Sequence, residues 1–173
     1  MPSPLALTFD CGTQSLRALL FDKSGNIVDM VTEYYPPYIS KKFGYAEQDA
    51  SVFVNAMCRA SFNLHNKRIS DWERIAVVSL TAIRDTYVCV DHNFEPVRPV
   101  IMWHDQREAR CADPIPAAAS MAFQLVGMSD FAVQQRRITK SNWIRENVPE
   151  NWKRTHMYLP FSAYMTYILT GNP

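Results

Sequence analysis

The sequence has 173 residues, of which 47% are hydrophobic, and its formal net charge at pH 7 is +1. This apolar content excludes a disordered chain and suffices for the core of about one domain. Because the charge is nearly neutral and no long basic run occurs, we expect neither nucleic acid nor a membrane as a partner. No apolar stretch approaches the ~18 residues of a membrane-spanning helix, and a strand at the N-terminus argues against a signal peptide.

Three strands are predicted first. Residues 5–11 alternate apolar and polar side chains, which is the period of a strand. Residues 15–21 follow a turn at Gly12, and residues 27–35 follow turn-forming residues 23–26. We therefore expect the chain to start with a β-hairpin and a third strand.

The turn at Gly12 is the first candidate site. Glycine lets a backbone approach a ligand closely, and Thr13, Gln14 and Ser15 add side-chain donors beside the turn amides. Such a cluster can hold phosphate oxygens, and Asp10 at the strand end can hold a hydrated Mg²⁺. An ordinary hairpin with a strand-end aspartate is the alternative that this segment leaves open.

The middle of the chain adds one long helix and further strands. A helix that Asp49 can cap is predicted because four apolar side chains fall on one face: Phe53, Met57, Ala60 and Leu64. Residues 74–81 have the composition of a central buried strand, and residues 86–91 and 97–103 are predicted strands.

From residue 105 onward the pattern becomes helical. Prolines and Gly127 separate short predicted helices, which cover residues 105–112, 117–125, 141–147, 150–156 and 160–169. The four cysteines and four histidines are scattered, so no metal site or disulfide framework is indicated. We expect reduced cysteines in a cytoplasmic protein.

Polar side chains follow three predicted strand ends: those around Gly12, Arg84 with Asp85, and residues 103–107. In an α/β sheet, strand ends at one edge build the ligand site. Arg84 and Asp85 together suit a ligand with several hydroxyls, although a surface ion pair is the alternative. Trp103 can stack on a sugar face, while the core is the more common place for a lone tryptophan.

Five stretches in order resemble the FGGY family of carbohydrate kinases, which includes glycerol kinase and xylulokinase. Their spacing is similar to that of the family, and they span nearly the whole chain. They are Phe9–Arg17, Tyr45–Asp49, Ile101–Arg107, Lys140–Ile144 with Asn147–Glu150, and Tyr164–Gly171.

The resemblance implies an α/β fold of the ribonuclease H-like (actin-like ATPase) type, in which a mixed sheet begins with the hairpin and is flanked by helices. It also implies a nucleotide-binding transferase of carbohydrate metabolism that uses ATP and Mg²⁺ to phosphorylate a sugar or polyol hydroxyl. On this resemblance Gly12–Ser15 and Arg17 face the ATP phosphates, and Asp10 lies near the Mg²⁺. The implied substrate contacts are Arg84, Asp85, Trp103, Asp105 and Gln135.

Several positions depart from the family pattern and leave the substrate open. Ala82-Ile83 replaces the Gly-Gln or Asn-Gln expected before the substrate pair, and Gln135 stands about where glycerol kinase has a tyrosine. Asp85 is shorter than the glutamate of the glycerol kinase branch, and Ala163 replaces a usual aspartate.

The resemblance also bears on domain organisation. In the family the catalytic base is an aspartate beyond the segment that matches Leu169–Gly171, and a second, ATP-binding domain comes later still. Residues 1–173 are therefore expected to be a partial N-terminal, sugar-binding domain of a two-domain kinase, with no catalytic base among them and a homodimer as a possible assembly. A non-catalytic sugar- or phosphate-binding module of the same fold is the alternative. An actin-like ATPase without a sugar substrate is a third hypothesis, against which Arg84-Asp85 and residues 103–107 argue.

Overall fold

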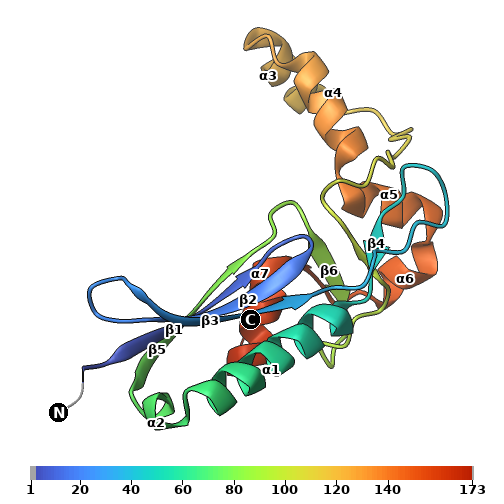
Figure 1. Ribbon diagram of the computed structural model, residues 1–173. Helices are drawn as coiled ribbons and strands as arrows, with labels where there is room; N and C mark the ends of the chain where they lie inside the picture. Colours follow the sequence, from blue (N-terminus) through green and yellow to red (C-terminus); the bar gives the residue numbers. More distant parts are fainter. Residues whose placement is uncertain (1–2, 173) are drawn as a thin grey trace.

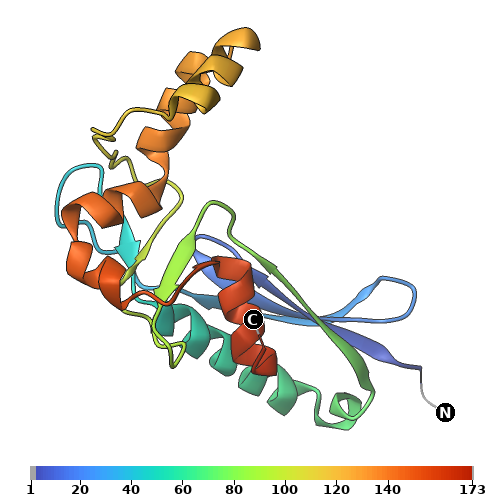
Figure 2. The ribbon, with the colours of Figure 1, turned by 180° about the vertical axis from the view of Figure 1, so that it is seen from behind.

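Two four-stranded sheets organise the protein (Figure 1). The computed structural model describes residues 3–172. The first sheet has the strand order β3-β2-β1-β5 and the second the order β4-β7-β6-β8. A pair of helices projects away from both sheets at one end of the molecule (Figures 1 and 2).

The first sheet contains the predicted hairpin. Strands β1 (Leu5–Cys11), β2 (Ser15–Phe21) and β3 (Ile27–Tyr34) are antiparallel neighbours, and β5 (Ile75–Ala82) runs parallel to β1. Alternate side chains of β1 and β2 are buried on one face of the sheet. The alternation read from the sequence is therefore the inside–outside pattern of a sheet that is covered on one face.

Helix α1 (Ala50–Lys67) supplies most of that cover. Its predicted apolar face is confirmed, since all four of its side chains are buried. Phe53 packs edge to face on Phe161 at the start of α7 (Phe161–Thr170) and on Tyr35 after β3, with ring centroids 4.7 and 4.9 Å apart. Asp49 occupies the N-cap position of α1, but its side chain makes no capping hydrogen bond.

The second sheet is antiparallel and smaller. It consists of β4 (Glu47–Gln48), β6 (Tyr87–Val90), β7 (Val100–Ile101) and β8 (Met157–Pro160). Helices α5 (Lys140–Asn147) and α6 (Pro149–Arg154) pack beside it around a second, small core. That core consists of Cys89, Val97, Ile101 and Ile144.

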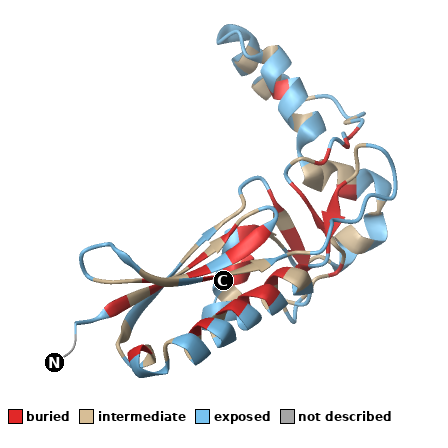
Figure 3. Ribbon diagram, in the orientation of Figure 1, coloured by how far each residue is buried: buried red, intermediate tan, exposed pale blue. Residues whose placement is uncertain are grey.

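The projecting helices are α3 (Ala117–Leu125) and α4 (Ser129–Ile138), which are mostly exposed (Figure 3). Ala132 is their one buried residue within the described part of the chain. Helix α3 has the predicted bounds, whereas α4, the short α2 (Ile69–Trp72), β4 and β8 were missed by the sequence analysis. Periodicity gives little signal for α2, β4 and β8, which have two to four residues. This reason does not apply to α4, which has ten.

Two predicted elements differ from the structure, one in length and one in type. The strand predicted over 97–103 is reduced to β7, and residues 105–112 form no helix. The cause of the second difference is distant in sequence: the Nζ of Lys140 donates hydrogen bonds to the carbonyls of Asp105 and Arg107, at 2.8 and 2.9 Å. A helix would need these carbonyls as its own acceptors.

The prediction that residues 74–81 form a central buried strand is also wrong. Strand β5 lies at the edge of its sheet, and among residues 3–172 it pairs with β1 alone. Val77 and Val78, which point to opposite faces, are 55% and 49% exposed. β-Branched content therefore identified a strand here without identifying its neighbours.

None of the helices between residues 3 and 172 has both the length and the apolar content that crossing a bilayer requires.

The contact between α1 and α7 yields a stability prediction. Phe53 is fully buried, so Phe53→Ala leaves a cavity and should lower the free energy of unfolding by about 3–5 kcal/mol. Phe62 lies on the same helix and is 65% exposed, so Phe62→Ala should change it by less than about 0.5 kcal/mol. Urea unfolding of both variants measures the difference, and equal losses would show that the helix face is assigned wrongly.

Candidate functional site

The turn between β1 and β2 is tightly built. The N–H of Gly12 donates to the carbonyl of Ser15 at 3.0 Å, and the N–H of Tyr35 donates to the carbonyl of Gln14 at 2.9 Å. A Cβ on Gly12 would lie 3.3 Å from the Ser15 carbonyl oxygen, so a side chain there would crowd the turn. Thr13 and Gln14 are exposed at the tip, and within residues 3–172 their own N–H groups have no acceptor. Two backbone donors are thus free to bind an anion.

Two other predicted residues of this turn differ in exposure. Ser15 is buried as the first residue of β2, so its hydroxyl is not part of the open tip. Arg17 is exposed and lies opposite Asp10 in the antiparallel register, where its guanidinium contacts the Asp10 carboxylate at 2.8 Å. An exposed pair of this kind contributes only ~0.2–1 kcal/mol. Asp10 can therefore exchange this partner for a metal-bound water at little cost.

The second strand end meets the first because β1 and β5 are parallel. Cys11 is paired with Ala82 at the end of the ladder, so both chains leave the sheet at the same edge. Arg84 and Asp85 follow at once and are exposed. Asp85 has a φ of 53°, a left-handed conformation that costs roughly 1–2 kcal/mol for a residue other than glycine.

Arg84 and Asp85 do not form the surface ion pair that was the alternative. Neither side chain has a salt-bridge partner among the described residues. One positive and one negative group thus stand side by side with their hydrogen-bonding capacity unused. Such a pair can donate to and accept from neighbouring hydroxyls of one ligand.

Trp103 follows β7 and is 53% exposed, so the core interpretation, one of the two left open for this residue, is wrong. Its Nε1–H donates to the Oγ1 of Thr13 at 3.0 Å. The indole ring is therefore fixed against the tip of the β1–β2 turn, and it links the third strand end to the first.

Asp105 lies at the centre of a hydrogen-bonded network. Its side chain is fully buried, and its carboxylate accepts hydrogen bonds from the N–H of Ala46 at 2.6 Å and from the Nε of Arg107 at 2.8 Å. The Nζ of Lys140 lies 3.8 Å from the same carboxylate. With these partners Asp105 holds the chain in position. It also lines one of the cavities described below, and its role as a substrate contact stays a prediction.

The sequence analysis did not predict that Lys140 lines the site. Its Nζ is held by the carbonyls of Asp105 and Arg107, and burial lowers its pKa, partly offset by the Asp105 carboxylate. The resemblance to the family includes this lysine, but nothing in its local sequence pattern indicates that it supports residues 35 positions earlier.

The strand ends enclose two adjoining cavities. One, of about 440 Å³, brings together six predicted residues: Asp10, Gly12, Thr13, Arg84, Asp85 and Trp103. The other, of about 580 Å³, is lined by Lys140 and by four predicted residues: Asp85, Trp103, Asp105 and Gln135. Asp85 and Trp103 border both cavities, whereas Gln14, Ser15 and Arg17 line neither.

The site suits a ligand with a charged and a hydroxylated part. Turn amides and the Asp10 carboxylate line the same cavity as an unpaired arginine and aspartate and an indole. Within residues 3–172 no three histidine, cysteine or acidic side chains converge on a metal site. A single carboxylate nevertheless fits Mg²⁺, which proteins commonly bind through one or two carboxylates together with substrate phosphates.

Residues 5–173 match the model of the FGGY family of carbohydrate kinases, N-terminal domain. The chain belongs to this family. The predicted ribonuclease H-like (actin-like ATPase) fold of class α/β, N-terminal part only, is thereby confirmed, since the structural neighbours are FGGY kinases.

Individual relatives agree with the FGGY assignment. The chain is 29% identical over 168 residues to a xylulose kinase of Lactococcus lactis, covering 96% of this chain and 33% of the relative. It is 31% identical over 172 residues to a glycerol kinase of Mycoplasma capricolum, covering 96% and 34%. The chain thus spans about a third of the length of the curated relatives it matches.

Solved structures show the same FGGY fold. Xylulose kinase from Rhodospirillum rubrum superposes with a TM-score of 0.77 at 21% identity, covering 96% of this chain and 34% of that one. Plasmodium falciparum glycerol kinase with ADP gives 0.74 at 16% identity, covering 98% and 35%.

Cys11 adjoins the β1–β2 turn, and its reactivity can be predicted. Burial, with a smaller effect of Asp10, raises the pKa of the Cys11 thiol to about 12. The thiolate fraction at pH 8 is then on the order of 10⁻⁴, so iodoacetamide should leave Cys11 intact while it modifies the exposed Cys58. Peptide mass spectrometry measures both positions. In urea both should react, and equal labelling of the folded protein would contradict the burial of Cys11.

Proposed function

We propose that this chain is the sugar-binding part of a kinase that transfers the γ-phosphoryl group of ATP to a hydroxyl of a sugar or polyol. The observation that carries the proposal is the cavity of about 440 Å³ in which Asp10, Gly12 and Thr13 face Arg84, Asp85 and Trp103. FGGY membership and the kinases among its relatives support it. Family membership also favours a carbohydrate kinase over an actin-like ATPase without a sugar substrate.

The turn would hold the phosphate end. The free N–H groups of Thr13 and Gln14 donate to phosphate oxygens, and the exposed guanidinium of Arg17 adds positive charge near them. Asp10 would hold Mg²⁺ through a bound water after releasing Arg17. Mg²⁺ neutralises the charge on the phosphates during transfer.

The acceptor would lie at the other end of the same cavity. Arg84 donates to its hydroxyls, Asp85 accepts from them, and the face of Trp103 packs on its carbon skeleton. Gln135 borders the adjoining cavity and would contact a longer acceptor. Because Trp103 is hydrogen-bonded to Thr13, the two ends keep a fixed spacing, which is what positioning catalysis requires.

We also propose that the domain continues beyond this segment, and that the base which deprotonates the acceptor hydroxyl comes from that continuation. The exposed valines on both faces of β5 support this proposal, because an uncovered apolar edge strand invites pairing. The coverage of about a third of each relative is consistent with it. A second domain would close on the cavity and exclude water.

The roles of Asp10 and Arg84 are separable by kinetics. In the protein extended along its reading frame and assayed with ATP on a panel of polyols and ketoses, Asp10→Ala should lower kcat by roughly 10²–10³, because it removes charge stabilisation of the transferring group. Arg84→Ala should mainly raise KM, by roughly 10- to 100-fold, because it removes a charged hydrogen bond to the acceptor.

Arg154→Ala is the matched control, since Arg154 is exposed on α6 and borders neither cavity. If Asp10→Ala and Arg84→Ala change acceptor affinity equally, the two roles are assigned wrongly. A folded, extended protein that binds polyols by calorimetry but never turns over ATP would instead identify a non-catalytic binding module.

The proposed continuation predicts a change in amide hydrogen exchange. Backbone amides of residues 75–82 should exchange at least about tenfold more slowly in the extended protein than in residues 1–173, because new contacts protect the open edge of β5. Amides of the central strand β2 should exchange at similar rates in both, since β2 is already paired on both sides. Equal rates for residues 75–82 would reject the proposed cover.

A further inference from the structure

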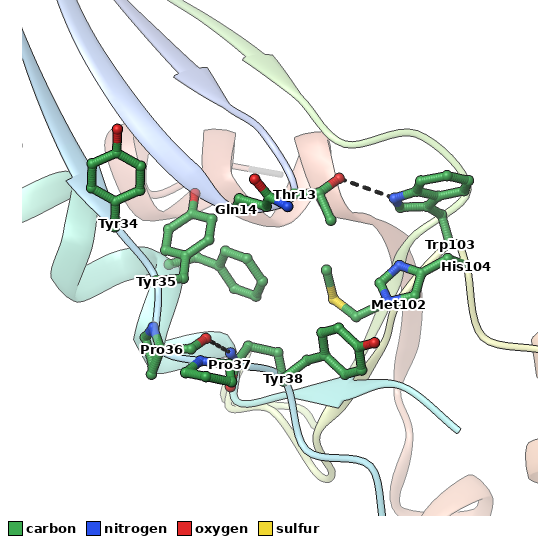
Figure 4. A pocket seen from close by; sticks show the side chains of 12 residues that line it. Thr13, Gln14, Tyr34, Tyr35, Pro36, Pro37, Tyr38, Met102, Trp103 and His104 are labelled. Atoms are coloured by element: carbon green, nitrogen blue, oxygen red, sulfur yellow. Dashed lines mark hydrogen bonds between the residues drawn. The ribbon is translucent and has the colours of Figure 1, made fainter. Parts of the chain in front are cut away.

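A third cavity, of about 470 Å³, lies on the other side of the β1–β2 turn and has no part in the proposed phosphoryl transfer. Its walls come from the end of β3, the following proline-containing linker and the segment after β7 (Figure 4). Rings dominate these walls, among them Tyr35, Pro37, Tyr38, Phe53, Trp103 and His104. The volume falls within the roughly 300–1,000 Å³ of small-molecule sites.

His104 is the unusual wall residue. Both of its ring nitrogens are shielded from solvent, and neither has a hydrogen-bond partner among the described residues. The imidazole is held edge to face by Tyr38 and Trp103, with ring centroids 4.8 and 5.4 Å away, and Figure 4 shows it turned toward the cavity. Leaving two polar atoms unpaired costs free energy, which a ligand group in the cavity could recover.

The remaining walls restrict the class of ligand. No Asp, Glu, Lys or Arg side chain lines the cavity, so a charged group would find no side chain of opposite full charge there. A polyol would leave most of its hydroxyls unpaired against tyrosine, phenylalanine and proline surfaces. A flat ring, in contrast, packs on such surfaces, and the exposed carboxamide of Gln14 offers a second polar contact at the rim.

We propose that this cavity binds a neutral, planar heteroaromatic ring of about the size of a nucleobase, which packs between Tyr38 and Trp103 and pairs one edge with His104. The site goes beyond the proposed kinase function. The hydrogen bond between Thr13 and Trp103 forms the wall that separates it from the 440 Å³ cavity. A bound ring would therefore restrain the indole that also borders the acceptor site.

The indole N–H signals of the protein test the proposal directly. Adenosine and uridine serve as neutral ring probes, and glycerol and xylitol serve as polyol probes without a ring. Titration with either nucleoside should shift the Trp103 signal in a saturable way, with a Kd of roughly 1 mM or tighter. The other three tryptophans lie outside the cavity and act as internal references: Trp72, Trp143 and Trp152.

Variants assign any binding to this cavity, because Tyr38 and His104 border neither of the two cavities of the proposed kinase site. His104→Leu and Tyr38→Ala should each weaken nucleoside binding by roughly three- to tenfold, through a lost hydrogen bond or a lost wall. Phe43→Ala is the matched control, since Phe43 lies in the same linker, is 100% exposed and does not line the cavity.

Saturable nucleoside shifts that both wall variants weaken and Phe43→Ala leaves unchanged support the site. Absence of saturation, equal binding by wild type and both wall variants, or equal shifts with xylitol would overturn it. Indole spectra without probe show whether each variant is folded. Should His104→Leu fail to fold, Tyr38→Ala alone decides, because Tyr38 is 48% exposed and its removal leaves the core intact.

Discussion

The buried guanidinium of Arg107 is the constraint on which the geometry of the site depends. It donates to the carboxylates of Asp105 and Glu47 at 2.8 Å each, and its carbon Cζ lies 3.9 Å from the ring centroid of Tyr45 and 4.5 Å from that of Trp143. Burying these charges is costly unless every partner is present. Those partners come from β4, α5 and the segment after β7. The contacts of the Arg107 guanidinium therefore fix the backbone of the segment that carries Trp103.

A second constraint is the register of β1 and β5. Their parallel pairing ends at Cys11 and Ala82, which makes the Gly12 turn and the Arg84–Asp85 pair leave the sheet at one edge. The charged side chains at this edge are paired weakly or not at all among the described residues. Asp10 is paired weakly in the open, whereas Arg84 and Asp85 have no partner in the described chain, so the site keeps its binding capacity for a ligand.

Local periodicity predicted the hairpin and the buried face of α1, because the register of one strand or helix decides both. It failed where distant side chains decide the backbone. Lys140 takes the carbonyls that a helix after Asp105 would need, and the same network buries the Asp105 side chain. The edge position of β5 could not be predicted either, since a β-rich run has the same composition at the edge and at the centre of a sheet. The core interpretation of Trp103 stayed open in the sequence analysis because no local signal reveals its hydrogen bond to Thr13.

Trp103 joins these constraints, because it borders all three cavities at once. An indole that is 53% exposed would ordinarily sample several rotamers, and ordering it costs entropy. Its backbone is fixed through the Arg107 network, and its Nε1–H is fixed by Thr13. A phenylalanine could supply a similar apolar face but has no donor for Thr13, so it would break the link between the β1–β2 turn and the segment after β7. The exposed tryptophan is therefore explained by its position between sites rather than by packing.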